Sequence, residues 1–164
     1  MATFTLFHVL ISLIGIITGL VVLGGLLSGR RLDGWTGIFL LTTAATSLTG
    51  FGFPVDRVLP SHIVGAISLV ALAIAGVARY RYRLAGGWRK AYVVTAVLSI
   101  YLNVFVLIVQ TFQKVPALRE LAPTQSEPPF AISQLIVLVM FGVLGYRAVV
   151  SFRDSSAAPA RQFL

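Results

Sequence analysis

The sequence predicts an all-α protein, a polytopic bundle of membrane-spanning helices. Hydrophobic residues make up 57% of the 164 residues and charged residues only 11%, and the mean hydropathy is +0.93. Soluble domains are about one quarter charged, so lipid rather than water must surround most of this chain. A helix needs roughly 20 residues to cross the hydrocarbon core. Stretches of about this length without a charged side chain cover residues 1–29, 34–55, 58–78, 91–113 and 128–146.

Five transmembrane helices are therefore expected. The first is predicted to be retained, because it has no basic segment before it and its apolar run is longer than a cleavable signal core. The second is the least regular, since Gly50, Gly52 and Pro54 loosen its end. One transmembrane domain is expected over residues 1–152, followed by a short disordered cytoplasmic tail at 153–164. The expected helices lie at about 4–27, 35–53, 61–79, 91–112 and 129–147.

The positive charges predict that the N-terminus lies outside and the C-terminus in the cytoplasm. Under the five-span model ten basic residues fall on one side and three on the other, which is a strong positive-inside bias. Tyrosine and tryptophan side chains gather at the same ends as the ten, where amphipathic rings favour the membrane interface. The expected location is therefore the inner, cytoplasmic membrane of a bacterium. The ten are Arg30, Arg31, Arg79, Arg81, Arg83, Arg89, Lys90, Arg147, Arg153 and Arg161, and the three are Arg57, Lys114 and Arg119.

Membrane topology also explains the formal charge of +8. On a soluble protein it would suggest nucleic acid, but here the basic residues sit in loops between apolar stretches, where topology and anionic lipid explain them. We therefore expect the lipid bilayer, and no nucleic acid, as a partner. The longest outer connection, 113–129, is predicted to hold one short interfacial helix around Leu118 and Leu121, and Pro128 suits the start of the last span.

Polar residues inside the spans predict where the interior of the bundle lies, because a polar side chain in hydrocarbon needs a partner. On the first helix His8, Ser12, Gly15 and Gly19 share one face, and the two glycines form a G-x-x-x-G pair that permits close packing. The fourth helix carries one polar stripe, and the second is rich in threonine. The fourth-helix stripe is Thr95, Ser99, Asn103, Gln110 and Gln113.

Helix direction places most of these groups in the outer half of the bundle. Few polar groups are expected in the inner half beyond Thr18 and Ser28. The outer half is thus the predicted ligand site, with Gln125 and Glu127 of the outer loop as capping residues. Its candidate binding residues are His8, Thr49, His62, Gln110, Gln113 and Gln134.

Two ligand classes fit this set. His8 and His62 could be the axial imidazoles of a non-covalent haem b. Haem iron is the only metal that the two histidines are expected to bind, because a copper or zinc site would lack a third and fourth ligand. A quinone head group could instead accept hydrogen bonds from histidine and glutamine while its tail runs between helices. The ligand itself stays unknown, as does the choice between the two.

The alternative is a non-enzymatic accessory or assembly subunit of a larger membrane complex, with other membrane subunits as partners. Small size, the lack of a soluble domain and the glycine-rich first helix favour it. Enzymatic activity is not expected, because no H-E-x-x-H or G-x-S-x-G motif and no pair of intramembrane carboxylates occurs in the sequence.

Overall fold

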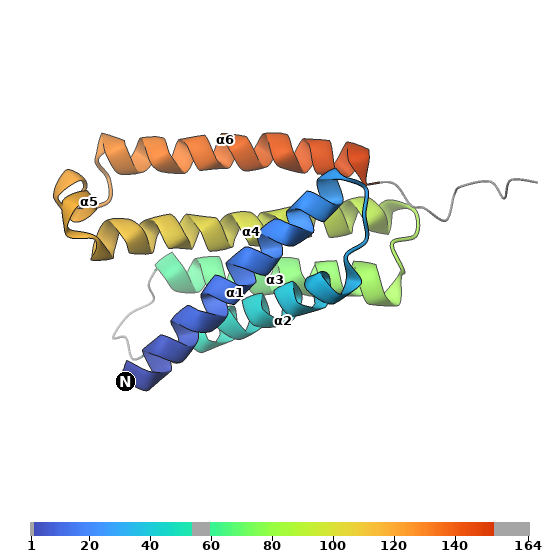
Figure 1. Cartoon of the computed structure of the whole chain (residues 1–164), viewed down its shortest axis with the longest axis horizontal. Coiled ribbons are helices and arrows are strands. Elements are labelled where there is room, and N and C mark those ends of the chain that lie inside the picture. The colour runs from blue at the N-terminus through green and yellow to red at the C-terminus, as the bar shows by residue number, and fades with distance from the viewer. Residues whose placement is uncertain (1, 54–59, 153–164) are drawn as a thin grey trace, which may run out of the picture.

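The structure is a computed structural model that describes residues 2–53 and 60–152. The described residues are helical and contain no strand, and the five long helices lie side by side in one bundle (Figure 1). Helices α1, α3 and α6 run in one direction, and α2 and α4 run in the opposite direction. The elements in order are α1 (Ala2–Leu27), α2 (Asp33–Gly50), α3 (Pro60–Gly76), the π-helical turn η1 (Val77–Arg81), α4 (Gly87–Lys114), α5 (Pro116–Leu121) and α6 (Pro128–Ser151).

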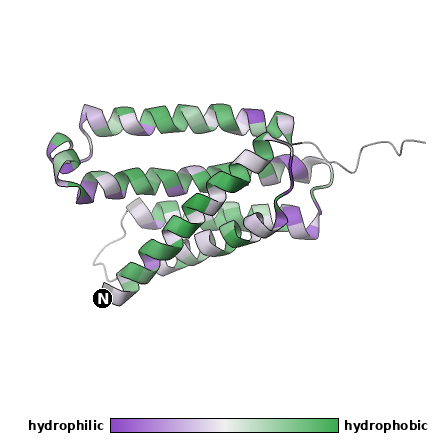
Figure 2. Cartoon of the chain, in the orientation of Figure 1, coloured by the Kyte–Doolittle hydropathy of each residue, from purple (hydrophilic) through white to green (hydrophobic). Residues whose placement is uncertain are grey.

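Four helices within the described residues are long and apolar enough to span a membrane. Hydrophobic residues cover their length and hydrophilic ones gather at both ends of the bundle (Figure 2). The four stretches are Thr3–Leu27, Ser61–Arg81, Gly87–Lys114 and Pro128–Ser151. Helix α2 is not among them, because its 18 residues begin with Asp33 and are rich in threonine. The chain is thus a helical bundle compatible with a multi-pass membrane protein.

The helix bounds agree with the sequence expectation in the interiors and differ at the ends. Helix α2 ends at Gly50, before Phe51 and Phe53, because glycine at 50 and 52 gives the last turn little support. The third helix changes at Val77 into η1, which no periodicity had indicated. The short helix expected in 113–129 is α5, and α6 begins at Pro128, whose missing N–H costs nothing at a helix start. The expected outer turn at 54–59 and the tail at 153–164 lie outside the described residues.

Helix α1 packs closely on α2 and α4 through its glycine face. A Cβ built on Gly15 would lie 3.0 Å from Thr43 Oγ1, and one built on Gly19 would lie 3.0 Å from the Phe39 ring and 3.1 Å from Ile100. Asn103 Nδ2 donates a hydrogen bond to the same Thr43 Oγ1 at 3.1 Å, so α4 joins this contact. The predicted close approach along the Gly15–Gly19 pair is confirmed.

The apolar core lies where α1, α2, α3, α4 and α6 meet, towards the end of the bundle that holds the loop between η1 and α4. Phe39 and Tyr92 are its largest fully buried side chains, and Phe152, just after α6, packs against Tyr92. Arg89 of α4 donates hydrogen bonds to the carbonyls of Val149, at 3.0 Å, and Phe152, which satisfies acceptors that the end of α6 leaves open. These contacts fix the end of α6 to the start of α4.

The two ends of the bundle have different chemistry. We call the end formed by the starts of α1, α3 and α6, the ends of α2 and α4, and α5 the histidine end, because His8 and His62 lie there (Figure 1). The opposite end, which holds the loops 28–32 and 82–86, is called the arginine end. The candidate site residues lie towards the histidine end.

Candidate functional site

His8 and Thr49 make a direct hydrogen bond between α1 and α2. His8 Nδ1 lies 2.8 Å from Thr49 Oγ1, and the Thr49 hydroxyl itself lies 2.8 Å from the carbonyl of Ala45 in its own helix. A hydroxyl has one proton to give, and here it goes to the carbonyl, so Thr49 accepts from His8 Nδ1–H. The imidazole is then held in the tautomer whose Nε2 carries a free lone pair.

Phenylalanine rings pack on both imidazoles. Phe53 contacts His8 edge to face, with ring centroids 5.1 Å apart, and Phe51 stacks on His62 at 5.4 Å. Phe4 contacts Phe53 in turn at 5.0 Å. Each histidine therefore packs against a phenylalanine of the segment after α2, His8 from the start of α1 and His62 from the start of α3.

Replacing Thr49 with valine is expected to lower the free energy of unfolding by about 1 kcal/mol, because an interhelical hydrogen bond in a membrane bundle is worth roughly 0.6–2 kcal/mol. Thr42→Val is the matched control on the same helix, since the Thr42 hydroxyl donates to Ile38 in its own helix at 2.7 Å. Thermal unfolding in detergent compares the two variants. Equal losses would contradict a special role for the His8–Thr49 contact.

The glutamines form a second group, on the α4–α6 side of the histidine end. Gln113 Nε2 donates to Gln125 Oε1 at 3.2 Å, and Gln125 Nε2 donates to the Val109 carbonyl at 3.1 Å. One turn earlier on α4, the Phe105 carbonyl accepts from Gln134 Nε2 at 3.2 Å. Gln134 Oε1 is buried and has no partner among the described residues. The predicted site residues therefore fall into a histidine group and a glutamine group.

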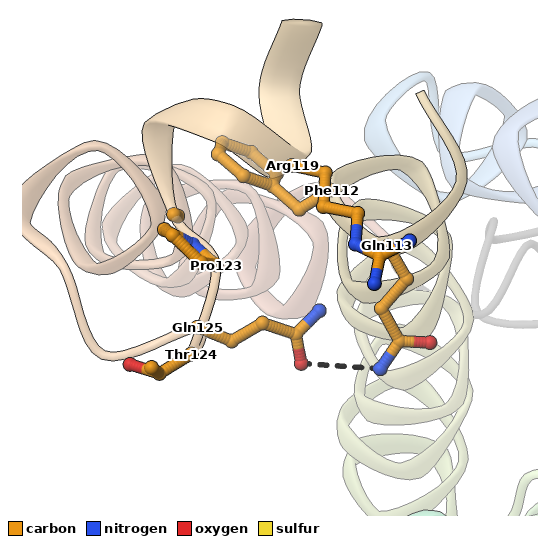
Figure 3. Close-up of a pocket in the computed structure, with 7 residues that line it drawn as sticks. Phe112, Gln113, Arg119, Pro123, Thr124 and Gln125 are labelled. Carbon is orange, nitrogen blue, oxygen red and sulfur yellow. Dashed lines mark hydrogen bonds between the residues drawn. The ribbon is translucent and has the colours of Figure 1, made fainter. Parts of the chain in front are cut away.

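A half-open cavity of about 470 Å³ lies beside the Gln113–Gln125 hydrogen bond (Figure 3). Helix α4 contributes Phe112 and Gln113, α5 contributes Arg119, and the following loop contributes Thr124 and Gln125. Ala122 and Pro123 complete the lining. Amide, guanidinium and hydroxyl groups thus line the same half-open space as the aromatic ring of Phe112.

The loop that closes this cavity is held by Glu127. Its Oε1 accepts hydrogen bonds from the Thr124 backbone N–H at 3.1 Å and the Thr124 hydroxyl at 2.8 Å, and its Oε2 accepts from the Ser126 backbone N–H at 3.1 Å. Desolvation raises the pKa of the Glu127 carboxyl, but these hydrogen bonds outweigh it and hold the pKa below its ordinary value. Glu127 therefore shapes the loop, whereas Gln125 lines the cavity.

Gln110 is half-buried, one turn before the end of α4, and it does not line this cavity. Arg119 does line it, although sequence reasoning had treated this residue only as a positive charge on the outer side. The sequence indicated the location of Arg119 only in part, because it predicted the short helix around Leu118 that carries this residue. Its position over the end of α4 depends on the turn at Val115, which no pattern specifies.

The arginine end, which the sequence predicts to be the inner half of the bundle, holds a buried polar cluster where few polar groups were expected. The Arg79 side chain is 5% exposed and forms an ion pair with Asp33, and its guanidinium lies 5.1 Å from the centre of the Tyr92 ring. Tyr92 and Thr36 are also buried, with their hydroxyl oxygens 3.4 Å apart. The wide π-helical turn η1 directs Arg79 inwards rather than into the loop.

Comparisons with known protein families, with characterised proteins and with solved structures find no match to this chain. Its function is therefore argued from its own residues. Two features bear on it: a polar cavity at the histidine end, and a direction of the helices that carries α2 from one end of the bundle to the other.

Proposed function

We propose that this chain is a five-span membrane protein, with its N-terminus outside and its C-terminus in the cytoplasm of a bacterial cell, that binds a small lipid-soluble ligand at its outer, histidine end. A quinone is the ligand class that the donors of this end fit best. The single observation that carries the binding proposal is the cavity in which Gln113, Arg119 and Gln125 converge.

Helix direction supports five spans rather than four. The ring of Phe53, after α2, contacts Phe4 near the start of α1, so α2 returns the chain to the end from which α1 departed. Helix α3 then starts at the same end as α1 and runs in the same direction (Figure 1). If α1 and α3 cross the bilayer in the same direction, α2 must cross it between them. At 1.5 Å per residue its 18 residues span about 27 Å, close to the ~30 Å of hydrocarbon.

The charge distribution supports the orientation. Asp33, the acidic residue at the start of α2, is paired with Arg79, which reduces the cost of placing both near the membrane interface. The arginine end carries most of the basic residues and is therefore proposed to face the cytoplasm. The histidine end then faces outwards.

A quinone fits the cavity because its carbonyl oxygens accept hydrogen bonds and its ring is flat and apolar. The amides of Gln113 and Gln125 and the Arg119 guanidinium supply donors, and the Phe112 ring supplies an apolar surface. An apolar tail attached to the ring would lie in lipid along α4 and α6, whose outer faces carry exposed leucine and valine side chains.

Haem b between His8 and His62 is less well supported. Phe53 packs on the His8 imidazole and Phe51 stacks on the His62 imidazole, so each histidine is already engaged by its own aromatic contact. An optical spectrum separates the two ligands, because a Soret band that disappears in both His8→Ala and His62→Ala variants would replace the quinone proposal with haem.

The test is binding of a short-tailed benzoquinone to the purified protein, measured by calorimetry in detergent. Gln113→Leu and Gln125→Leu are each expected to weaken binding about tenfold, since losing a hydrogen bond to a bound carbonyl costs about 1.4 kcal/mol. Thr111→Val is the control at the same end of α4, because its hydroxyl donates to the Leu107 carbonyl of its own helix at 2.7 Å.

Equal weakening by all three variants, or no binding to the unmodified protein, would overturn the quinone proposal. Co-migration of the native protein with a larger complex in mild detergent, together with no binding, would instead favour the accessory-subunit role. In that case the exposed apolar face of α6, with Leu135 and Val139, would contact protein as well as lipid.

A further inference from the structure

The loop between η1 and α4 has a fixed conformation at the arginine end. Leu84 is 3% exposed, and its N–H donates to the Ala78 carbonyl at 3.0 Å, so the loop is anchored at its centre. Arg83 and Leu84 have φ angles of 50° and 63°, in the left-handed region that side chains with a Cβ rarely adopt. Burial of Leu84 accounts for this conformation, which leaves the Arg83 side chain exposed beside it.

Two aromatic rings stack across the same loop. The rings of Tyr82 and Trp88 are 4.0 Å apart and nearly parallel, at 3°, and the Arg81 guanidinium lies 5.7 Å from the centre of the Tyr82 ring. Tyr82 is 42% exposed and Trp88 is 37% exposed. An apolar ring surface next to cations is the arrangement that favours the boundary between acyl chains and head groups.

Within the described residues, no acidic side chain is paired with the exposed positive charges of this loop. Of the acidic residues that the structure describes, only Asp33 lies at the arginine end, and it is paired with Arg79. Arg89 is engaged by the carbonyls at the end of α6. The side chains of Arg81, Arg83 and Lys90 are exposed.

We propose that residues 81–90, which are the loop 82–86 with the helix ends that flank it and are called here the basic–aromatic loop, bind the phosphate of an anionic phospholipid. Arg81, Arg83 and Lys90 would hold the phosphate, and the Tyr82–Trp88 pair would lie against the upper acyl chain. The partner is a lipid rather than an acidic protein because the loop joins Ser61–Arg81 and Gly87–Lys114, two helices that can span a membrane, so its side chains start at the level of the head groups. The proposal depends on these helices being in the bilayer and not on a ligand at the histidine end.

The test compares phosphatidylglycerol with phosphatidylcholine added to the purified protein in neutral detergent. Phosphatidylglycerol is expected to raise the temperature of unfolding, and native mass spectrometry is expected to retain it on the protein. Arg83→Gln/Lys90→Gln should weaken phosphatidylglycerol binding by about 30-fold, on the basis of roughly one kilocalorie per mole for each cation near an anionic membrane surface. Without lipid this variant should unfold at the unmodified temperature, because both side chains are exposed.

The matched control is Arg30→Gln/Arg147→Gln, which removes two exposed cations from the same end but outside the loop. It should retain phosphatidylglycerol binding within about threefold. Equal stabilisation by the two lipids would overturn the proposal. So would equal weakening by the two double variants, because that result would mean a diffuse charge effect and no site in the loop.

Discussion

Replacing Gly19 with leucine is expected to lower the free energy of unfolding by about 3 kcal/mol, the upper part of the range for overpacking. Already the first carbon of a side chain at this position would lie 3.0 Å from the Phe39 ring on α2 and 3.1 Å from Ile100 on α4. Both neighbours are fully buried, so neither can move aside without disturbing the core. Helix α1 would have to separate from the bundle.

Gly24→Leu is the matched control for this prediction. It lies on the same helix, and a Cβ built there meets nothing within 4 Å. Its effect should stay within about 0.5 kcal/mol, as for other changes at exposed positions. Thermal unfolding in detergent measures both variants, and a loss at Gly24 as large as that at Gly19 would mean that α1 does not pack through its glycine face.

Replacing Arg79 with alanine is expected to cost about 2–4 kcal/mol, through loss of the ion pair with Asp33, the contact with the Tyr92 ring and the packing of a long buried side chain. Asp33→Asn should cost less, about 1 kcal/mol, because the Asp33 side chain is 81% exposed and water screens its charge. The unequal losses distinguish a buried cation held by several groups from a simple salt bridge.

A double-mutant cycle on Asp33 and Arg79 measures their coupling, which we expect at about 1 kcal/mol. Arg81→Ala is the control, because Arg81 lies in the same π-helical turn but is exposed. If Arg79→Ala and Arg81→Ala destabilise the protein equally, the burial of Arg79 has no energetic consequence and the cluster at the arginine end does not stabilise the bundle.

Much of the fold could be predicted from the absence of charge. Stretches free of charged residues located the long helices, and the spacing of Gly15 and Gly19 identified the packed face of α1. The π-helical turn and the Asp33–Arg79 pair could not be predicted, because an arginine at the end of an apolar stretch is usually an interfacial residue. Its burial requires a partner 46 residues away whose position depends on how α2 and α3 pack.

The candidate site could be predicted only in part. Helix direction predicted that His8 and Thr49 lie at the same end of the bundle, and the structure shows a hydrogen bond between them. The positions of Phe51 and Phe53 depend on how the chain turns after Gly50. The sequence therefore did not predict that these two rings pack on the imidazoles. The cavity depends likewise on the turn at Val115 that brings Arg119 over the end of α4.

Membrane topology is the most direct test of the five-span arrangement. The chain contains no cysteine, so each introduced thiol is the only one available to a membrane-impermeant maleimide. Five spans with the N-terminus outside predict that Thr3→Cys and Glu120→Cys are labelled on intact cells, and that Ala85→Cys is labelled only after the membrane is opened. If Thr3→Cys and Ala85→Cys are both labelled on intact cells and Glu120→Cys is not, α2 does not cross the membrane, and the cavity would then face the cytoplasm.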